Sequence, residues 1–156
     1  MRYKTNDEKY SKNSTFNIIS AYRHQAKTVA GAIKAFVESE TTDGNDYIIE
    51  GYHVEPKLIK ELMDIFSGNV RGVILIKKDV IDFQSGLRKS STPNDWILSK
   101  TQDEATFSKI AAMVIEYGSL LEDEASKLGV KATITDGDFA HQLQSTTEYL
   151  LEPVNR

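Results

Sequence analysis

Hydrophobic residues recur every three or four positions in five segments of the chain, and this spacing predicts five helices. In chain order, the predicted helices begin at Ser14 or Thr15, at Pro56, at Asp79, at Thr101 and after residues 136–138. Each start carries a residue type that caps or opens a helix. Gly129 ends the fourth and longest helix, because glycine readily adopts the left-handed conformation found at helix ends.

Three short apolar runs lie between these helices, at residues 47–49, 73–76 and 130–135. The first two do not alternate with polar residues, which is typical of parallel strands buried on both faces. The order of helices and strands therefore predicts an α/β fold, with a three-layer parallel sheet flanked by helices and right-handed crossovers. This single domain occupies residues 14–152, after a polar and flexible N-terminus at residues 1–13.

The composition is that of a globular protein, with 156 residues, 40% of them hydrophobic and 27% charged. The net charge of −4 gives no reason to expect nucleic acid or an anionic membrane as a partner. The chain has no cysteine, which excludes disulfides and thiolate chemistry. It has neither an apolar run of membrane-spanning length nor an apolar segment near its start that would form a signal peptide, so we expect a cytoplasmic protein.

Polar residues follow each of the three predicted strands: Glu50 with His53, then Lys77 to Asp79, then Asp136 to Asp138. Ligands of parallel sheets bind at the carboxyl ends of the strands, so these clusters are expected to converge. A carboxylate in the position of Glu50 holds Mg²⁺ or accepts hydrogen bonds from the backbone of the next helix. We favour helix capping for Asp136 and Asp138.

Five residues are candidates for binding a charged or polar ligand. Arg23 interrupts the apolar stripe of the first helix and needs a buried partner or a bound anion, and Gln25 flanks it. Arg88 and Lys89 end a helix before the Ser/Thr/Pro loop at residues 90–95; they are either cations of a movable lid or a solvated helix end. His53 is either a ligand of phosphate or substrate hydroxyl groups, or a packed side chain.

Several of these segments occur together in one order: Tyr47 to Pro56, Gly72 to Ile76, the Arg88 helix with Pro93 to Trp96, and Thr133 to Phe139. In this order they resemble the later two-thirds of P-loop small-molecule kinases of the zeta-toxin-like, 2-phosphoglycerate-kinase-like and nucleotide-kinase-like group.

The resemblance implies ATP and Mg²⁺ as cofactors and a small-molecule substrate. It further implies that Glu50 is the acid near the metal, that Arg88 and Lys89 are lid cations, and that Asp136 and Asp138 border the adenine. Arg23 and Gln25 would line the acceptor side, and His53 would contact the substrate.

The chain departs from this family in lacking the phosphate-binding sequence G-x-x-x-x-G-K-[ST] and a strand before the first helix. We therefore expect a kinase-like protein whose ancestral activity is ATP-dependent phosphorylation, inactive or N-terminally truncated as this chain. One alternative is a non-catalytic interaction or regulatory protein, and another is a metal-dependent hydrolase using Glu50, Asp136 and Asp138.

The missing strand would leave a gap between the strand ending at Glu50 and the strand at residues 73–76. Unpaired backbone groups on the rims of such a gap destabilise a domain. We therefore expect a homodimer whose contact covers the exposed apolar rim.

Overall fold

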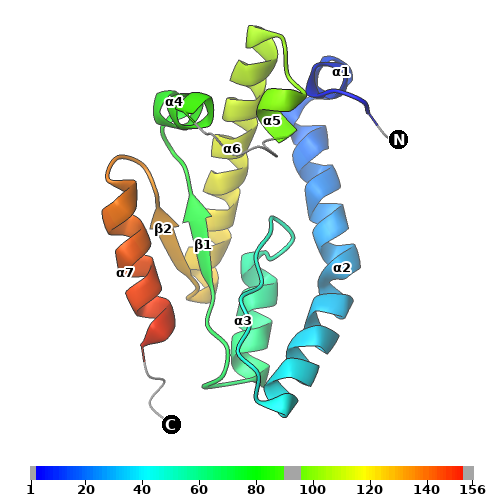
Figure 1. Cartoon of the computed structure of the whole chain (residues 1–156). Helices are drawn as coiled ribbons and strands as arrows, with labels where there is room; N and C mark the ends of the chain where they lie inside the picture. Colours follow the sequence, from blue (N-terminus) through cyan, green and yellow to red (C-terminus); the bar gives the residue numbers. More distant parts are fainter. Residues whose placement is uncertain (1–2, 90–95, 153–156) are drawn as a thin grey trace.

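The two longest helices of the described residues are α2 (Thr15–Asp43) and α6 (Glu104–Leu128) (Figure 1). The structure is a computed structural model that describes residues 3–89 and 96–152. The Ser14 hydroxyl caps α2 by accepting a hydrogen bond from the backbone N–H of Asn17. Gly129, with φ of 67°, ends α6 in the left-handed conformation, as the sequence predicts.

Five shorter helices complete the helical part of the described chain. They are α1 (Asn6–Lys12), α3 (Pro56–Ile65), α4 (Val80–Lys89), α5 (Trp96–Ser99) and α7 (Phe139–Leu151). Pro56 occupies the first turn of α3, where a missing N–H costs nothing. Asp79 caps α4 by accepting hydrogen bonds from the N–H groups of Ile81 and Asp82. The predicted starts of these two helices are confirmed.

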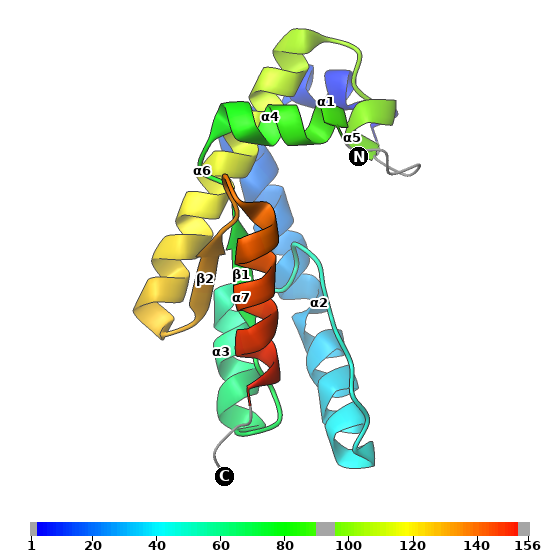
Figure 2. The same ribbon diagram turned by 60° about the vertical axis from the view of Figure 1, so that its left-hand side comes forward.

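The sheet of the described residues has two parallel strands, β1 (Val73–Ile76) and β2 (Lys131–Ile134). In their register, Val73 lies opposite Lys131 and Ile76 opposite Ile134. The strands lie between α6 and α7 (Figures 1 and 2). On the α7 side, the Thr146 hydroxyl donates to the Thr133 hydroxyl at 3.3 Å. Strand β1 has the predicted bounds, and β2 lies within the predicted run at residues 130–135.

Helix α6 joins the main hydrophobic clusters, because it packs against both strands and against α1, α2, α3 and α4. One cluster contains Tyr10, Ile18, Ile19, Ile110, Met113 and Tyr117. A second contains Ile59, Ile74, Ile76, Ala125 and Val130, and a third contains Val37, Leu58 and Leu62 between α2 and α3. The fold thus depends on one central helix with other elements arranged around it.

Two glycines allow close approach of these elements. A Cβ atom at Gly118 would lie 3.0 Å from Ile76 Cγ2, so the absence of a side chain lets α6 pack closely on β1. A Cβ atom at Gly72, just before β1, would collide with the Cγ2 atom of the buried Ile59 on α3. These two glycines therefore let α6 and α3 approach β1 and the chain just before it.

The predicted α/β fold with a three-layer parallel sheet is wrong. Helices make up 68% of the structure, and the described sheet has two strands. The predicted strand at residues 47–49 is the reason for the error, since these residues form no ladder with the strands of the sheet. An isolated apolar run indicates a strand only when a neighbour pairs with it. The P-loop NTPase-like architecture required that sheet, so this prediction is wrong as well.

The predicted gap in the sheet loses its basis for the same reason. It required a strand ending at Glu50 and another at residues 73–76 with an empty place between them. In the structure, β1 pairs directly with β2, and residues 47–50 lie outside the sheet. The homodimer derived from the gap stays a prediction.

The N-terminal segment differs from the flexible stretch expected for residues 1–13. Residues of this segment form α1, in which Asn6 and Tyr10 are buried. The backbone N–H of Asn6 donates to the Lys100 carbonyl at 2.8 Å, and its side chain donates to the Thr101 hydroxyl at 3.0 Å. Thr101 is therefore bonded to α1, and Asp103 caps α6 in its place.

The predicted loop at residues 90–95 lies outside the described residues. Within the part of the chain that the structure covers, no helix combines the length and apolar character needed to cross a membrane.

We expect Gly72→Ala to lower the free energy of unfolding by about 1–3 kcal/mol, because its methyl group overpacks the buried Ile59. The control is Gly31→Ala on α2, where nothing lies within 4 Å of the new Cβ atom. It should raise the free energy of unfolding by about 0.5–1 kcal/mol, since alanine favours the helix. Urea unfolding of both variants measures the difference. Equal effects would contradict the packing of α3 against Gly72.

Candidate functional site

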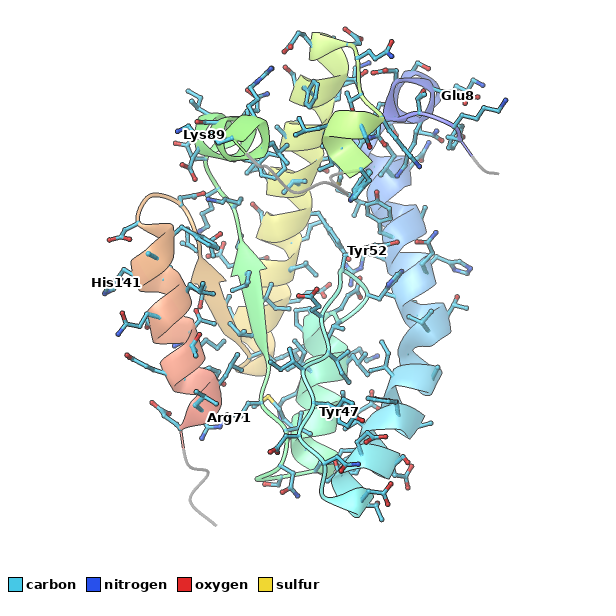
Figure 3. All side chains as sticks on the ribbon, viewed as in Figure 1. Glu8, Tyr47, Tyr52, Arg71, Lys89 and His141 are labelled. Atoms are coloured by element: carbon cyan, nitrogen blue, oxygen red, sulfur yellow. The ribbon has the colours of Figure 1, made fainter. Side chains whose placement is uncertain are left out.

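Three predicted site residues, Arg23, Gln25 and His53, meet where the middle of α2 faces the 51–55 loop. The Tyr52 hydroxyl donates to Gln25 Oε1 at 3.0 Å. The centre of the Tyr52 ring lies 3.9 Å from that of His53 and 4.7 Å from that of Tyr22. Figure 3 shows Tyr52 beside α2. The structure therefore brings these three residues into one neighbourhood, and their role in substrate binding stays a prediction.

Arg23 is held in a cluster of ion pairs. Its Nε atom lies 3.5 Å from Glu55 Oε1, and its Nη2 atom lies 2.5 Å from Glu124 Oε1 on α6. The Tyr117 hydroxyl donates to the same Glu55 oxygen at 2.8 Å. The prediction that Arg23 needs a polar partner is confirmed, and two carboxylates supply it. These contacts fix α2 and the start of α3 to α6.

The cluster also changes the protonation equilibria of its members. Burial raises the pKa of Tyr117, and the hydrogen bond to Glu55 raises it further. Partial burial lowers the pKa of Arg23, but the hydrogen bond to Glu124 and the nearby Glu55 outweigh it, so the net shift is upward. Tyr117 therefore stays protonated and Arg23 charged across the physiological pH range. This arrangement stabilises the contacts that α2 and the start of α3 make with α6.

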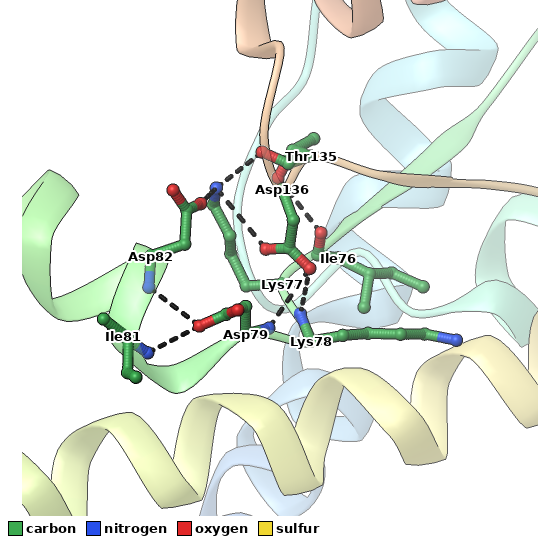
Figure 4. A network of polar contacts seen from close by, with 8 residues as sticks. All are labelled: Ile76, Lys77, Lys78, Asp79, Ile81, Asp82, Thr135 and Asp136. Atoms are coloured by element: carbon green, nitrogen blue, oxygen red, sulfur yellow. Dashed lines mark hydrogen bonds and ion pairs between the residues drawn. The ribbon is translucent and has the colours of Figure 1, made fainter.

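A second polar cluster lies at the carboxyl ends of β1 and β2 (Figure 4). Lys77 Nζ donates to Asp82 Oδ2 and to the carbonyl oxygen of Thr135, both at 2.5 Å. It also lies 3.6 Å from Asp136 Oδ1. The hydrogen bond from Lys77 is the main cause that lowers the pKa of Asp82. This lysine connects the end of the sheet to the first turn of α4.

The two predicted aspartates after β2 bind backbone groups. Asp136 Oδ2 accepts hydrogen bonds from the N–H groups of Lys78 at 2.9 Å and Asp79 at 3.1 Å. Asp138 caps α7 by accepting from the N–H of His141 at 3.1 Å. Helix capping is therefore confirmed for Asp138. Asp136 instead fixes the chain after β1 to the end of β2.

The other predicted site residues lie apart from this cluster. Glu50 lines a groove on α2 and does not follow a strand, so the predicted convergence of three polar clusters is wrong for the first of them. Arg88 Nη2 lies 2.5 Å from Glu104 Oε2, and its guanidinium carbon lies 5.2 Å from the centre of the Phe107 ring. Lys89 is the exposed last residue of α4. The roles expected for Glu50 toward Mg²⁺ and for these cations toward ATP stay predictions.

An apolar groove that the sequence analysis did not identify lies between α2 and the chain that follows it. It has a volume of about 530 Å³ and is lined by Val29, Ala32, Ile33, Phe36, Tyr47, Ile48, Ile49 and Glu50. The rings of Phe36 and Tyr47 meet edge to face, with centres 5.2 Å apart. The chain runs back along α2 as a stretched-out trace (Figure 2). The β-prone run at residues 47–49 was the only sequence signal for this site.

The backbone of residues 46–50 makes no hydrogen bond to any other part of the described chain. Its apolar side chains are also exposed: 94% of Ile48, 59% of Tyr47 and 38% of Ile49 is accessible to solvent. A run of unpaired N–H and C=O groups beside exposed aliphatic side chains is a template for pairing with another strand. We call residues 46–50 the open segment.

No group of three His, Asp or Glu side chains in the described ranges is placed to hold a metal ion. Comparisons of the chain with protein-family models, with curated proteins and with solved structures found no match.

We expect Tyr117→Phe to lower the free energy of unfolding by about 1.5–3 kcal/mol, because it removes a hydrogen bond to the buried carboxylate of Glu55. Tyr10→Phe is the matched control, since the buried Tyr10 hydroxyl has no hydrogen-bond partner in the described part of the chain. Its removal should cost little or increase stability. Urea unfolding near neutral pH compares the two, and equal losses would refute a structural role of the Tyr117 hydroxyl.

Stability should fall above about pH 10, where the tyrosines of the unfolded chain ionise. Burial raises the pKa of both Tyr10 and Tyr117, so the folded protein keeps protons that the unfolded chain releases. The resulting stabilisation is fully present below the pKa that these tyrosines have in the unfolded chain, and it is lost as the pH rises above that value. In Tyr117→Phe, the free energy of unfolding should fall less steeply with pH above about pH 10. Identical slopes in the variant and the natural chain would contradict this.

Proposed function

We propose that this chain is a non-catalytic interaction protein that binds an extended segment of a partner protein along the open segment. The observation that carries the proposal is that residues 46–50 run along α2 without backbone partners among the described residues, while 94% of Ile48 is exposed. Strand addition of this kind supplies backbone hydrogen bonds for affinity and side-chain contacts for specificity.

The residue types of the open segment support this proposal. Tyrosine and isoleucine are among the residues most often found in strands, because they pack well on a pleated surface. Covering one exposed isoleucine contributes about 1.5–3 kcal/mol to association. The groove beside the segment offers Phe36 and Ile33 as further apolar contacts for a partner.

An enzymatic function has less support, because the candidate catalytic groups are bonded to one another. Arg23 is paired with Glu55 and Glu124, and Lys77 is bonded to Asp82 and the Thr135 carbonyl. An active site needs polar groups that converge on a cavity where a substrate fits. The groove beside the open segment is instead lined by apolar residues and Glu50.

A second copy of the chain is a less favourable occupant than a different partner. Antiparallel pairing of two open segments about Ile48 would place Asp46 opposite Glu50 at both ends. Parallel pairing in register would place Asp46 opposite Asp46. Like charges directly opposite each other in a sheet are destabilising.

We expect peptides of about ten residues, selected from a random displayed library on the full chain, to bind at the open segment. Hydrogen exchange measured on the complex should show protection of the backbone amides in residues 46–50. Ile48→Asp should weaken binding about tenfold or more, because it removes the most exposed apolar contact.

The matched control is Ile81→Asp on α4, an identical substitution at a residue that is 78% exposed. It should leave peptide binding unchanged. Selected peptides that leave exchange at residues 46–50 unaltered would refute the proposal, and so would a library with no binder tighter than about 1 mM.

A further inference from the structure

The two faces of the open segment differ in chemistry. Side chains of a strand alternate, so once the segment pairs as a strand, Asp46, Ile48 and Glu50 would share one face and Tyr47 and Ile49 the other. Tyr47 contacts the Phe36 ring of α2, which places Tyr47 against the helix. The exposed fractions agree, since Ile48 is the most accessible of the three apolar residues. Asp46 and Glu50 are also exposed, so in the paired strand the face that contains Ile48 has the pattern acidic, aliphatic, acidic.

The negative charge around this segment is only partly balanced. Residues 35–56 contain six Asp and Glu residues and no Lys or Arg, whereas the rest of the chain has 17 acidic and 19 basic residues. Of the six, Glu55 is paired with Arg23. Within the described chain, neither Asp46 nor Glu50 has an ion-pair partner. Lys34, the nearest basic residue before this stretch, is paired with Glu61 on α3. The open segment thus lies in a region of negative potential.

On the basis of the function proposed above, we infer that the bound partner segment is basic and has the pattern basic–x–aliphatic–x–basic. Its aliphatic residue would lie opposite Ile48, and its two basic residues would lie opposite Asp46 and Glu50. Opposite charges on one face of a strand pair stabilise it, and like charges destabilise it. The negative potential would also speed the approach of a basic segment.

Three capped peptides of about nine residues test this inference. They share one core of alternating Val and Thr and carry Lys, Ser or Glu at the two flanking positions. Each is titrated into the full chain, with hydrogen exchange to locate the site. At about 50 mM salt, the Lys peptide should bind about tenfold more tightly than the Glu peptide, with the Ser peptide between them. At about 500 mM salt the difference should shrink.

A charge-reversal pair of variants separates local from overall charge. Asp46→Lys combined with Glu50→Lys should reverse the order of the three peptides. The control combines Glu116→Lys and Asp123→Lys on α6, which changes the net charge equally at exposed positions away from the open segment. It should keep the original order.

The possible failures are distinguishable. Equal affinities of the three peptides, with protection of residues 46–50, would overturn the inferred charge pattern and leave strand binding intact. A reversed order in the α6 control would also overturn it, because overall charge would then explain the preference. Absence of protection with all three peptides would overturn the proposed function as well. A doubling of mass with concentration that Ile48→Asp abolishes would show that a second copy occupies the segment, against the inference.

Discussion

The packing of α6 against nearly every other element is the interaction on which this structure depends. Ile110, Ala111 and Ala125 of this helix have no exposed surface, and α6 contacts both strands as well as α1, α2, α3 and α4. A sheet of two strands cannot bury enough apolar surface to be stable alone. The central helix supplies that burial, and Gly118 lets it approach Ile76 closely.

The charged residues follow from the same arrangement. Arg23 and Glu55 are joined to Glu124 and Tyr117 of α6, and Lys78 is paired with Glu122 of the same helix. Groups that resemble catalytic residues in the sequence thus fasten neighbouring elements to the central helix. The open segment lies instead against α2, where its apolar side chains and backbone groups are accessible. Binding of a partner strand is the use that this contrast favours.

Local signals in the sequence were sufficient for several helix ends and for the two strands. Ser14, Pro56 and Gly129 mark helix ends through their own conformational preferences, so a few neighbouring residues decide them. Pairing is not local: residues 47–49 have strand-forming side chains, but only the arrangement of distant segments determines whether a neighbour is present. The burial of α1 depends in the same way on a contact between Asn6 and Lys100. The need of Arg23 for a partner could be predicted from its apolar surroundings, but the identity of Glu124 could not.

Hydrogen exchange of the free protein tests the central claim that the open segment lacks a strand partner. The Thr135 amide, which donates to the Ile76 carbonyl at 2.8 Å, and the amide of the fully buried Ile110 serve as protected references. We expect the amides of residues 47–50 to exchange at nearly the rate of an unstructured chain, because no hydrogen bond slows them. Protection of these amides equal to that of Thr135 would mean that the segment is already paired, and would contradict an open segment that is free to bind a partner strand.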